Sequence, residues 1–367
     1  MSFRHPGPSE VLVLSDAFPS SPVLGTGAKV AGTRGPSAGY AGTTYAALDL
    51  GTNNCRLLIA RPTADGFRVI DAFSRIVRLG EGLSRTGRLS DAAIERTIAA
   101  LRVCRDKMAA RGVARARTIA TEACRSADNG PAFVDKVRDE LGLALEIVDR
   151  ETEAHLAAAG VGDLADRDAK SIVMFDIGGG SSEIIWLKAD SRAPRRRVLA
   201  WESMRLGVVS LAEMFGGVDV TDRTFADMTA HVGVALRPFV ERVADETRCD
   251  RFHLLGTSGT VTTIAGVHLD LPRYDRRAVD GLWLGRREVD AAVARVRAMS
   301  YAERAANACI GHERADLVLA GCAILQAIRA EFPSERLRIA DRGLREGILS
   351  QLMREDRVGP HRRSLAR

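Results

Sequence analysis

The sequence lacks any uninterrupted run of about 18 apolar residues, the length that a membrane-spanning helix needs. Near the N-terminus, the apolar segment 11–14 is too short to form the core of a signal peptide. We therefore expect no membrane partner and a cytoplasmic location.

Cysteines at metal-binding spacing are also missing. The chain contains six cysteines, namely Cys55, Cys104, Cys124, Cys249, Cys309 and Cys322. None belongs to a Cys-x-x-Cys pair, and none has a histidine at the spacing of a zinc site. Such thiols are typical of a cytosolic protein that keeps them reduced.

A large excess of one charge is absent as well. The chain has 53 basic and 47 acidic residues, so its net charge is only +6. This modest excess favours anionic partners, and nucleic acid, polyphosphate and anionic nucleotides are all compatible with it. Arginine clamps phosphate with two hydrogen bonds, but a GC-rich genome that uses Arg in place of Lys also explains the bias. We expect no specific nucleic acid partner.

A glycine-rich stretch, residues 175–183, is the most informative feature that is present. It reads Phe-Asp-Ile-Gly-Gly-Gly-Ser-Ser-Glu and joins two short apolar segments, 172–175 and 184–187. Such a pattern predicts a hairpin. The backbone N–H groups of the glycines, with the Ser181 and Ser182 hydroxyls, can cradle a phosphate. Asp176 and Glu183 offer the oxygen ligands that Mg²⁺ prefers, although a plain turn with surface acids has the same composition.

The same layout occurs earlier in the chain, which argues for an internal repeat. Residues 47–59 place Asp49 and Gly51 at the positions of Asp176 and Gly178, an offset of 127 residues. This offset is about one domain length. If the two Asp-Gly turns face each other, a cleft with a phosphate-binding loop on each side results.

Length and periodicity predict two α/β domains with mixed sheets flanked by helices. We expect a disordered tail at 1–43, a first domain at 44–168, a second domain at 169–355 and a frayed end at 356–367. Predicted strands include 67–73, 116–120, 143–148, 252–255 and 337–340. Predicted helices begin at Asp91 after the N-cap Ser90, at Pro131 and after the cap Asp149, and others cover 222–243, 287–299 and 312–331.

Several motifs, taken together, resemble the exopolyphosphatase/guanosine pentaphosphate phosphatase family of the actin-like (ribonuclease H-like, ASKHA) superfamily. They are Asp49-Leu-Gly-Thr, the 176–183 loop, Ala120-Thr121-x-Ala123-x-Arg125, Arg205-Leu206-Gly207, Gly256-x-Ser258-Gly259-Thr260 and the segment 343–347. The resemblance runs from about residue 45 to 353 and implies two similar actin-like domains around a cleft. The chain is similar to short family members that lack C-terminal helical domains.

The resemblance implies a phosphoanhydride hydrolase with a divalent cation, Mg²⁺ or another such as Mn²⁺. Its substrate would be polyphosphate or guanosine pentaphosphate, and a homodimer is implied too. The catalytic glutamate maps to Glu153, which would activate water; Glu151 is its nearest competitor. Thr152, His155 and Arg342 differ from the residues that many members have at these positions.

Each candidate residue also has a purely structural interpretation. Asp176, Glu183 and Asp49 are the metal candidates, and Asp side chains also cap turns. Arg125 would clamp the terminal phosphate or form a surface ion pair. The phosphate-cradle candidates are Thr52, Asn53, Asn54, Gly179, Gly180, Ser181 and Ser182, whose alternative role is turn formation.

Two other functions compete with hydrolysis of a phosphoanhydride. One is an ATPase or kinase of the same superfamily, and the other is a non-catalytic sensor of polyphosphate or alarmone.

Overall fold

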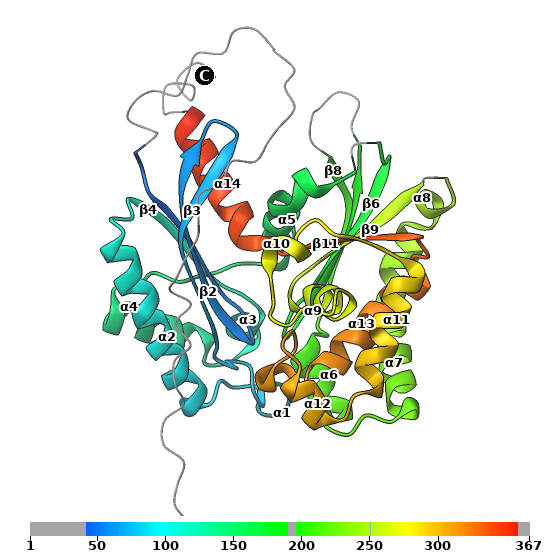
Figure 1. Ribbon diagram of the computed structural model, residues 1–367. Helices are drawn as coiled ribbons and strands as arrows, with labels where there is room; N and C mark the ends of the chain where they lie inside the picture. The colour runs from blue at the N-terminus through cyan, green and yellow to red at the C-terminus, as the bar shows by residue number, and fades with distance from the viewer. Residues whose placement is uncertain (1–41, 167, 190–195, 250, 359–367) are drawn as a thin grey trace, which may run out of the picture.

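The computed structural model describes residues 42–166, 168–189, 196–249 and 251–358 (Figure 1). The predicted N-terminal tail up to residue 41, the end of the chain from 359, and Arg192 and Arg195 lie outside the described residues. Two twisted sheets stand side by side, each covered by helices, so the predicted α/β class with mixed sheets is confirmed.

The helices are α1 (Leu83–Thr86), α2 (Asp91–Ala110), α3 (Glu122–Ser126), α4 (Gly130–Leu141), α5 (Arg150–Val161), α6 (Val208–Phe215), α7 (Asp222–Arg242), α8 (Ala244–Cys249), α9 (Gly259–His268), α10 (Arg276–Val279), α11 (Arg286–Ala298), α12 (Tyr301–Ala306), α13 (Val318–Glu331) and α14 (Leu344–Val358). Short 3₁₀ turns cover η1 (Gly162–Leu164) and η2 (His312–Arg314). The expected caps are confirmed: Ser90 accepts from the Ala93 N–H, and Asp149 accepts from the Thr152 N–H.

The first sheet has the strand order β3-β2-β1-β4-β5. Its strands are β1 (Tyr45–Leu50), β2 (Asn54–Thr63), β3 (Gly66–Ile76), β4 (Arg115–Ala120) and β5 (Glu146–Ile147). The β1–β2–β3 meander is antiparallel, whereas β4 and β5 run parallel to β1. Helices α2 and α4 bury their apolar stripes on one face, and α14 packs on the other.

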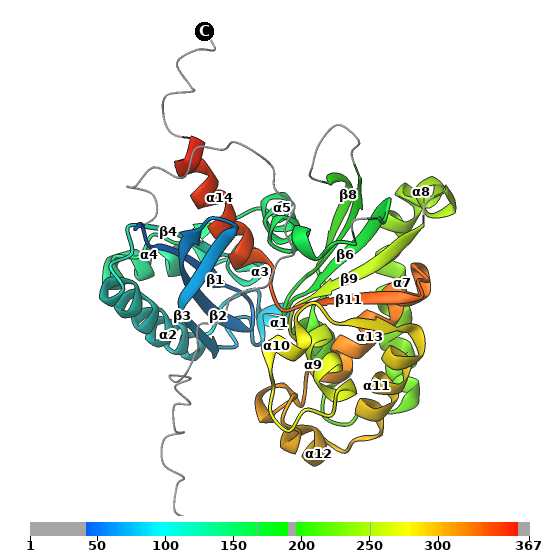
Figure 2. The same cartoon turned by 45° about the horizontal axis from the view of Figure 1, so that its top comes forward.

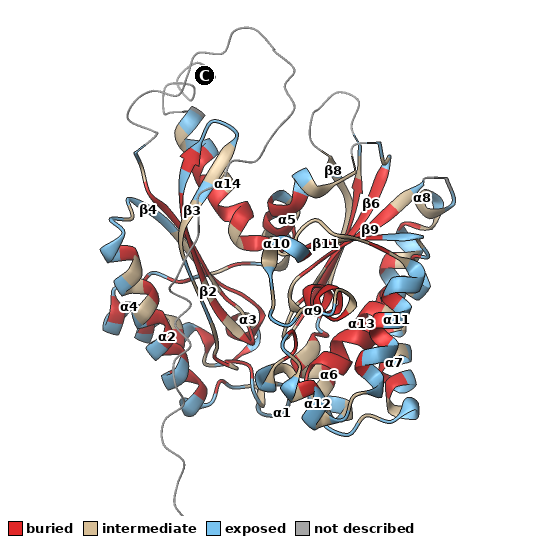
Figure 3. Ribbon diagram, viewed as in Figure 1, coloured by how far each residue is buried: buried red, intermediate tan, exposed pale blue. Residues whose placement is uncertain are grey.

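The second sheet has the order β10-β11-β9-β6-β7-β8. Its strands are β6 (Ser171–Ile177), β7 (Ser182–Lys188), β8 (Arg197–Met204), β9 (Phe252–Thr257), β10 (Trp283–Gly285) and β11 (Arg336–Ala340). Helices α7, α9, α11 and α13 build the large core on one face. In Figure 3 the two sheets and helices α9 and α13 are largely buried, while outward-facing helices such as α7 and α11 expose their polar sides.

The internal repeat is real in three dimensions. The meander β8-β7-β6 with parallel β9 and β11 has the same order and directions as β3-β2-β1 with β4 and β5. The two turns also close with the same hydrogen bond: Gly51 N–H donates to the Asn54 carbonyl at 2.9 Å, and Gly178 N–H donates to the Ser181 carbonyl at 2.9 Å.

Helices α5 and α14 lie between the two sheets (Figure 2). The two helices cross at glycines. A Cβ on Gly160 would lie 1.8 Å from the Gly343 carbonyl oxygen, and one on Gly347 would lie 1.9 Å from the Leu156 carbonyl oxygen. Only glycine permits this approach. The chain enters the second sheet after α5 and returns to the first sheet through α14, which follows β11 directly. The residue limits of the two domains remain a prediction.

Two sequence expectations are wrong in extent. The strand expected at 143–148 is only Glu146–Ile147, because β4 offers it just Ile119 and Ala120 as partners. The helix expected from 312 begins at Val318, because the segment first forms a 3₁₀ turn after Gly311, whose φ is +75°. The expected frayed end at 356–367 overlaps α14 only at 356–358 and otherwise lies outside the described residues; within α14, Ile348 and Leu349 are buried against β1 and β2.

Among the residues that the structure describes, none of the helices combines the length and apolar character needed to cross a membrane.

Candidate active site

The two glycine turns meet face to face. A Cβ on Gly179 would lie 3.1 Å from the Asn53 nitrogen, and one on Gly180 would lie 2.5 Å from the Thr52 hydroxyl oxygen. Loop 51–54 and loop 178–181 are therefore in van der Waals contact. The expectation that the two Asp-Gly turns face each other is confirmed, and they meet at this point.

Loop 51–54 is fixed by its own domain. The Thr52 carbonyl accepts from the Gly80 N–H at 2.9 Å, and the Asn53 carbonyl accepts from the N–H groups of Val77 and Arg78. The Thr52 and Asn53 side chains are mostly buried. The Oδ1 atoms of Asn53 and Asn54 are buried without a hydrogen-bond partner among the described residues. These two amide oxygens are thus available as acceptors or as metal ligands in the cleft.

Loop 178–181 is fixed by the start of α6. The N–H groups of Val208 and Val209 donate to the carbonyls of Gly178 and Gly179 at 2.9 and 2.8 Å. These carbonyls satisfy the unpaired N–H groups at the N-terminus of the helix. Both serine hydroxyls are engaged: Ser182 donates to the Leu206 carbonyl at 2.7 Å, and Ser181 donates to Glu183 Oε1 at 2.8 Å. A phosphate would therefore meet backbone groups of this loop more readily than the Ser182 hydroxyl.

Four carboxyl groups surround the two loops. Asp49 and Asp176 are half-buried at the ends of β1 and β6, while Glu153 and Glu183 are buried. Burial raises the pKa of all four, and for Asp176, Glu183 and Glu153 repulsion from another of these carboxylates adds to the rise. The pKa of Asp176 is about 6 and that of Glu183 about 7; the pKa of Glu153 is raised well above its usual range, by burial first and then by Glu183.

Glu153 and Glu151, the two candidates for the general base, point to different sides of α5. Glu153 is 9% exposed and lies within the electrostatic reach of Glu183 and Asp49. Glu151 is exposed and lines a groove of about 550 Å³ with Arg117 and Gln351 on the far side of the helix. His155 is exposed as well, and its Nδ1 contacts the Glu151 carbonyl oxygen at 2.8 Å. Only Glu153 faces the loops.

Arg125 lies next to Glu153 and is already well occupied. Its Nη1 donates to Glu153 Oε2 at 3.0 Å and to the Val148 carbonyl at 2.7 Å, and its Nε and Nη2 both donate to Glu122. A guanidinium has five N–H groups. One N–H of Nη2 therefore remains for a phosphate. A clamp through two hydrogen bonds, as expected from the sequence, would need two free N–H groups.

Three further arginines face the cleft without an ion pair among the described residues. They are Arg56 of β2, Arg314 at the end of η2, and Arg345 of α14. Burial lowers the pKa of both Arg314 and Arg345, and the nearby Arg56 lowers them further. The sequence indicated Arg56 weakly and missed the other two, although Arg345 stands inside the motif at 343–347. Such like-charged, unpaired cations suit an anionic ligand.

The residues present fit a divalent cation in part. Asp49, Asp176 and Glu183 supply hard oxygen ligands, and burial is the first cause of their raised pKa values. No three of the described His, Cys, Asp and Glu residues are close enough to form a ready-made metal cluster. Mg²⁺ does not need one, because it usually binds one or two carboxylates together with substrate phosphates and waters.

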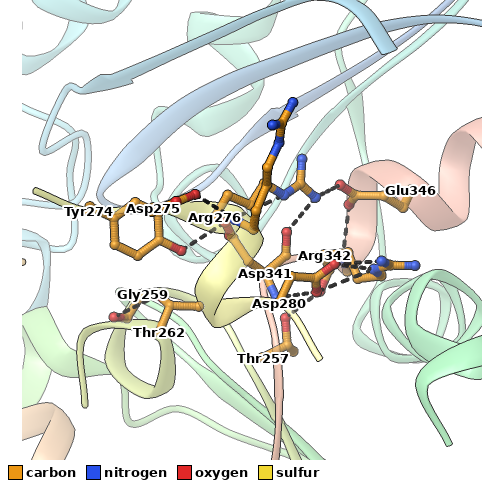
Figure 4. A network of polar contacts seen from close by, with 12 residues as sticks. Thr257, Gly259, Thr262, Tyr274, Asp275, Arg276, Asp280, Asp341, Arg342 and Glu346 are labelled. Atoms are coloured by element: carbon orange, nitrogen blue, oxygen red, sulfur yellow. Dashed lines mark hydrogen bonds and ion pairs between the residues drawn. The ribbon is translucent and has the colours of Figure 1, made fainter. Parts of the chain in front are cut away.

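A second polar network lies where β11 passes into α14 (Figure 4). Arg342 contacts both Asp280 oxygens and donates to Asp163 Oδ2 at 2.9 Å. Its side chain thus ties the 341–343 connection to the turn after α5, rather than adding a free cation to the cleft. Close by, Arg276 Nη2 donates to Glu346 Oε1 at 3.0 Å, and the Tyr274 hydroxyl donates to Asp341 Oδ2 at 2.8 Å.

Two similar α/β domains that present Asp-Gly turns to a shared acidic cleft define a protein of the actin-like superfamily. The comparisons with known proteins narrow this class. The Ppx/GppA phosphatase family matches residues 58–356, and the chain belongs to this family.

Its relatives carry two different names. The chain is 30% identical over 328 residues to exopolyphosphatase 2 of Mycobacterium tuberculosis, covering 84% of this chain and 98% of that protein. It is 28% identical over 313 residues to the guanosine-5'-triphosphate,3'-diphosphate pyrophosphatase of Photobacterium profundum; 84% of this chain but only 59% of that protein is covered. The crystal structure of the Aquifex aeolicus family member superposes with a TM-score of 0.69 at 26% identity, covering 86% of this chain and 99% of that one.

Proposed function

We propose that this protein hydrolyses a terminal phosphoanhydride bond, releasing phosphate from inorganic polyphosphate, from the 5' γ-position of guanosine pentaphosphate, or from both. The observation that most supports this proposal is the position of Glu153. Its carboxylate is buried and faces the two glycine loops, which meet each other. Family membership and relatives with both names support this choice of reaction.

In the proposed mechanism, the phosphate end of the substrate enters between loops 51–54 and 178–181. Backbone N–H groups of the loops and the remaining N–H of Arg125 bind the terminal phosphate. Arg56, Arg314 and Arg345 bind the phosphates that follow. Glu153 orients a water molecule and takes its proton as the oxygen attacks phosphorus in line. No covalent intermediate with the protein forms.

A divalent cation, Mg²⁺ in the first instance, would be held by Asp176 and Glu183 with Asp49 as a third candidate, and it would neutralise phosphate oxygens. Ser181 and Ser203 both donate to Glu183 Oε1 at 2.8 Å, which fixes this carboxylate and leaves its other oxygen free of these two hydroxyls. Substrate entry would require the loops to separate, because even a Cβ on Gly179 would lie only 3.1 Å from the Asn53 nitrogen.

The test is phosphate release by the purified protein in Mg²⁺, with long-chain polyphosphate, guanosine pentaphosphate and ATP supplied in parallel. Turnover of polyphosphate or guanosine pentaphosphate at least tenfold above that of ATP supports the proposal and identifies the preferred substrate. Preference for ATP would make the protein an ATPase. Binding of polyphosphate without turnover of any substrate would favour a sensor. Sedimentation of the same sample tests the homodimer expected from the family.

A further inference from the structure

Glu122 is a buried acid that takes no direct part in the proposed reaction. It is the first residue of α3 and is 6% exposed. Strand β4 ends at Ala120, and α3 begins one residue later, after Thr121. Ala120 lies opposite Leu50, and the Thr121 N–H donates to the Leu50 carbonyl. Glu122 is therefore placed at the edge of the sheet from which loop 51–54 emerges.

The carboxylate of Glu122 holds two arginines at once. Its Oε2 accepts from Arg125 Nε at 3.1 Å and from Arg125 Nη2 at 2.6 Å. Arg150, the first residue of α5, donates through Nη2 to both Glu122 oxygens at 2.9 Å. Burial raises the pKa of Glu122, but hydrogen bonds from Ser126 and Arg125 outweigh burial and hold it below its usual value. Glu122 is thus an ionised anchor.

This anchor decides how Arg125 meets Glu153. Glu122 holds the Nε–Nη2 edge of Arg125, so only Nη1 reaches Glu153. Nη1 donates one hydrogen bond to Glu153 and one to the Val148 carbonyl. The guanidinium is planar and rigid, so one fixed edge fixes the other. Without Glu122, Arg125 could turn and bind Glu153 through two nitrogens, which would occupy both of its oxygens.

Glu122 also contacts the opposite wall of the cleft. A Cβ placed on Gly180 would lie 3.3 Å from Glu122 Cγ. The side chain is therefore packed between Arg125 and loop 178–181. Its loss would affect the two groups that are proposed to meet the terminal phosphate.

We propose that Glu122 is a positioning residue: it holds one edge of Arg125 so that Arg125 contacts Glu153 through a single nitrogen and leaves a Glu153 oxygen free for water. The inference rests on the proposed function of Glu153. In this proposal, Glu122 itself touches neither the water nor the terminal phosphate.

The test begins with Glu122→Gln, which keeps the side-chain volume but removes the charge that binds Arg125. We expect kcat to fall at least tenfold while KM changes less than threefold, after correction for the folded fraction. Glu122→Asp, which keeps the charge, should recover part of the loss. The matched control is Asp71→Asn, because Asp71 also joins two basic side chains, Lys107 and Arg111, but on β3, away from the cleft.

A double-mutant cycle separates positioning from plain loss of structure. If Glu122 acts through Arg125, adding Glu122→Gln to an Arg125→Gln protein should reduce kcat by less than twofold further. Fully multiplicative losses in the double variant would overturn the proposal, as would a Glu122→Gln enzyme with unchanged kcat.

A crystal structure of Glu122→Gln gives a readout that does not depend on activity. We expect Arg125 to bind Glu153 through two nitrogens; an Arg125 that keeps its present single contact would contradict the inference. If the wild-type protein releases no phosphate at all, the proposed function fails, and this structure still decides whether Glu122 sets the Arg125–Glu153 contact.

Discussion

Arg56 and Glu183 occupy equivalent positions in the two hairpins that carry the glycine turns. Arg56 lies opposite Asp49 in the β1–β2 pair, and Glu183 lies opposite Asp176 in the β6–β7 pair. The repeat therefore keeps the two aspartates but places a cation on one wall of the cleft and a carboxylate on the other. A chain of phosphates with a divalent cation suits such a cleft.

The basic wall should govern substrate binding more than chemistry. We predict that Arg56→Gln and Arg314→Gln each raise KM about tenfold with kcat within about threefold, because a charged hydrogen bond is worth about 1.5–3 kcal/mol. Steady-state kinetics of phosphate release measures this. Arg68→Gln removes an exposed arginine of β3 and serves as the matched control. Unchanged KM in both cleft variants would count against an arginine-lined phosphate site.

The acidic wall should make cation binding depend on pH. Without a cation, burial and Asp176 raise the pKa of Glu183 to about 7, so this group is largely protonated below that pH. A bound cation must displace the proton, so affinity should increase as pH rises through 7. We predict that Mg²⁺ binds about tenfold more tightly at pH 8 than at pH 6. Calorimetric titration at both pH values measures it, and Glu183→Gln should reduce the difference to about twofold, the part that Asp176 with its pKa of about 6 still contributes.

Asp71 tests the electrostatics of the first domain independently of function. Burial raises its pKa, but hydrogen bonds from Lys107 and Arg111 outweigh burial and leave the pKa below the usual value. A lowered pKa contributes stability above the unfolded pKa, and this contribution is lost as pH falls. Asp71→Asn should therefore cost about 0.5–1 kcal/mol of unfolding free energy near pH 7 and much less near pH 2, below the lowered pKa. Urea unfolding of wild type and Asp71→Asn at the two pH values measures the difference in unfolding free energy. An equal difference at both pH values would refute the ion-pair explanation.

The crossing of α5 and α14 should tolerate no side chain at Gly347. A Cβ there would lie 1.9 Å from the Leu156 carbonyl oxygen, so Gly347→Ala must separate the helices and should cost about 2 kcal/mol or more. Gly233 lies inside α7, where a Cβ would approach the Glu331 carboxylate no closer than 4.0 Å. Gly233→Ala should instead stabilise by about 0.5–1 kcal/mol. Denaturant unfolding of both variants provides the comparison, and similar effects would show that the crossing is loose.

The sequence alone predicted the repeat and its turns, because Asp, Gly and short apolar strands recur at a fixed offset. It also predicted the start of α2 at Asp91 after the N-cap Ser90, because capping is a local property. It did not predict α14, although Leu344, Ile348 and Leu352 recur every four residues. The motif at 343–347 carried no expectation of a helix, although α14 begins there.

The candidate site was predictable only in part. Asp49, Glu153, Asp176 and Glu183 stand in motifs, and the structure brings them together. Arg314 and Glu122 had no local signal: one lies at a 3₁₀ turn far along the chain, and the other is a helix-start acid like many others. Their importance depends on neighbours that tertiary folding supplies. The roles of all site residues remain predictions.

The central claim is that Glu153 activates the attacking water, and the most direct measurement compares Glu153→Gln with Glu151→Gln. Both remove one carboxylate from the start of α5, but only Glu153 faces the loops. With Mg²⁺ and whichever substrate wild type prefers, Glu153→Gln should lose on the order of 10² or more in phosphate release while still binding substrate. Glu151→Gln should stay within about threefold of wild type. Near-normal release by Glu153→Gln, or a comparable loss in Glu151→Gln, would contradict the assignment.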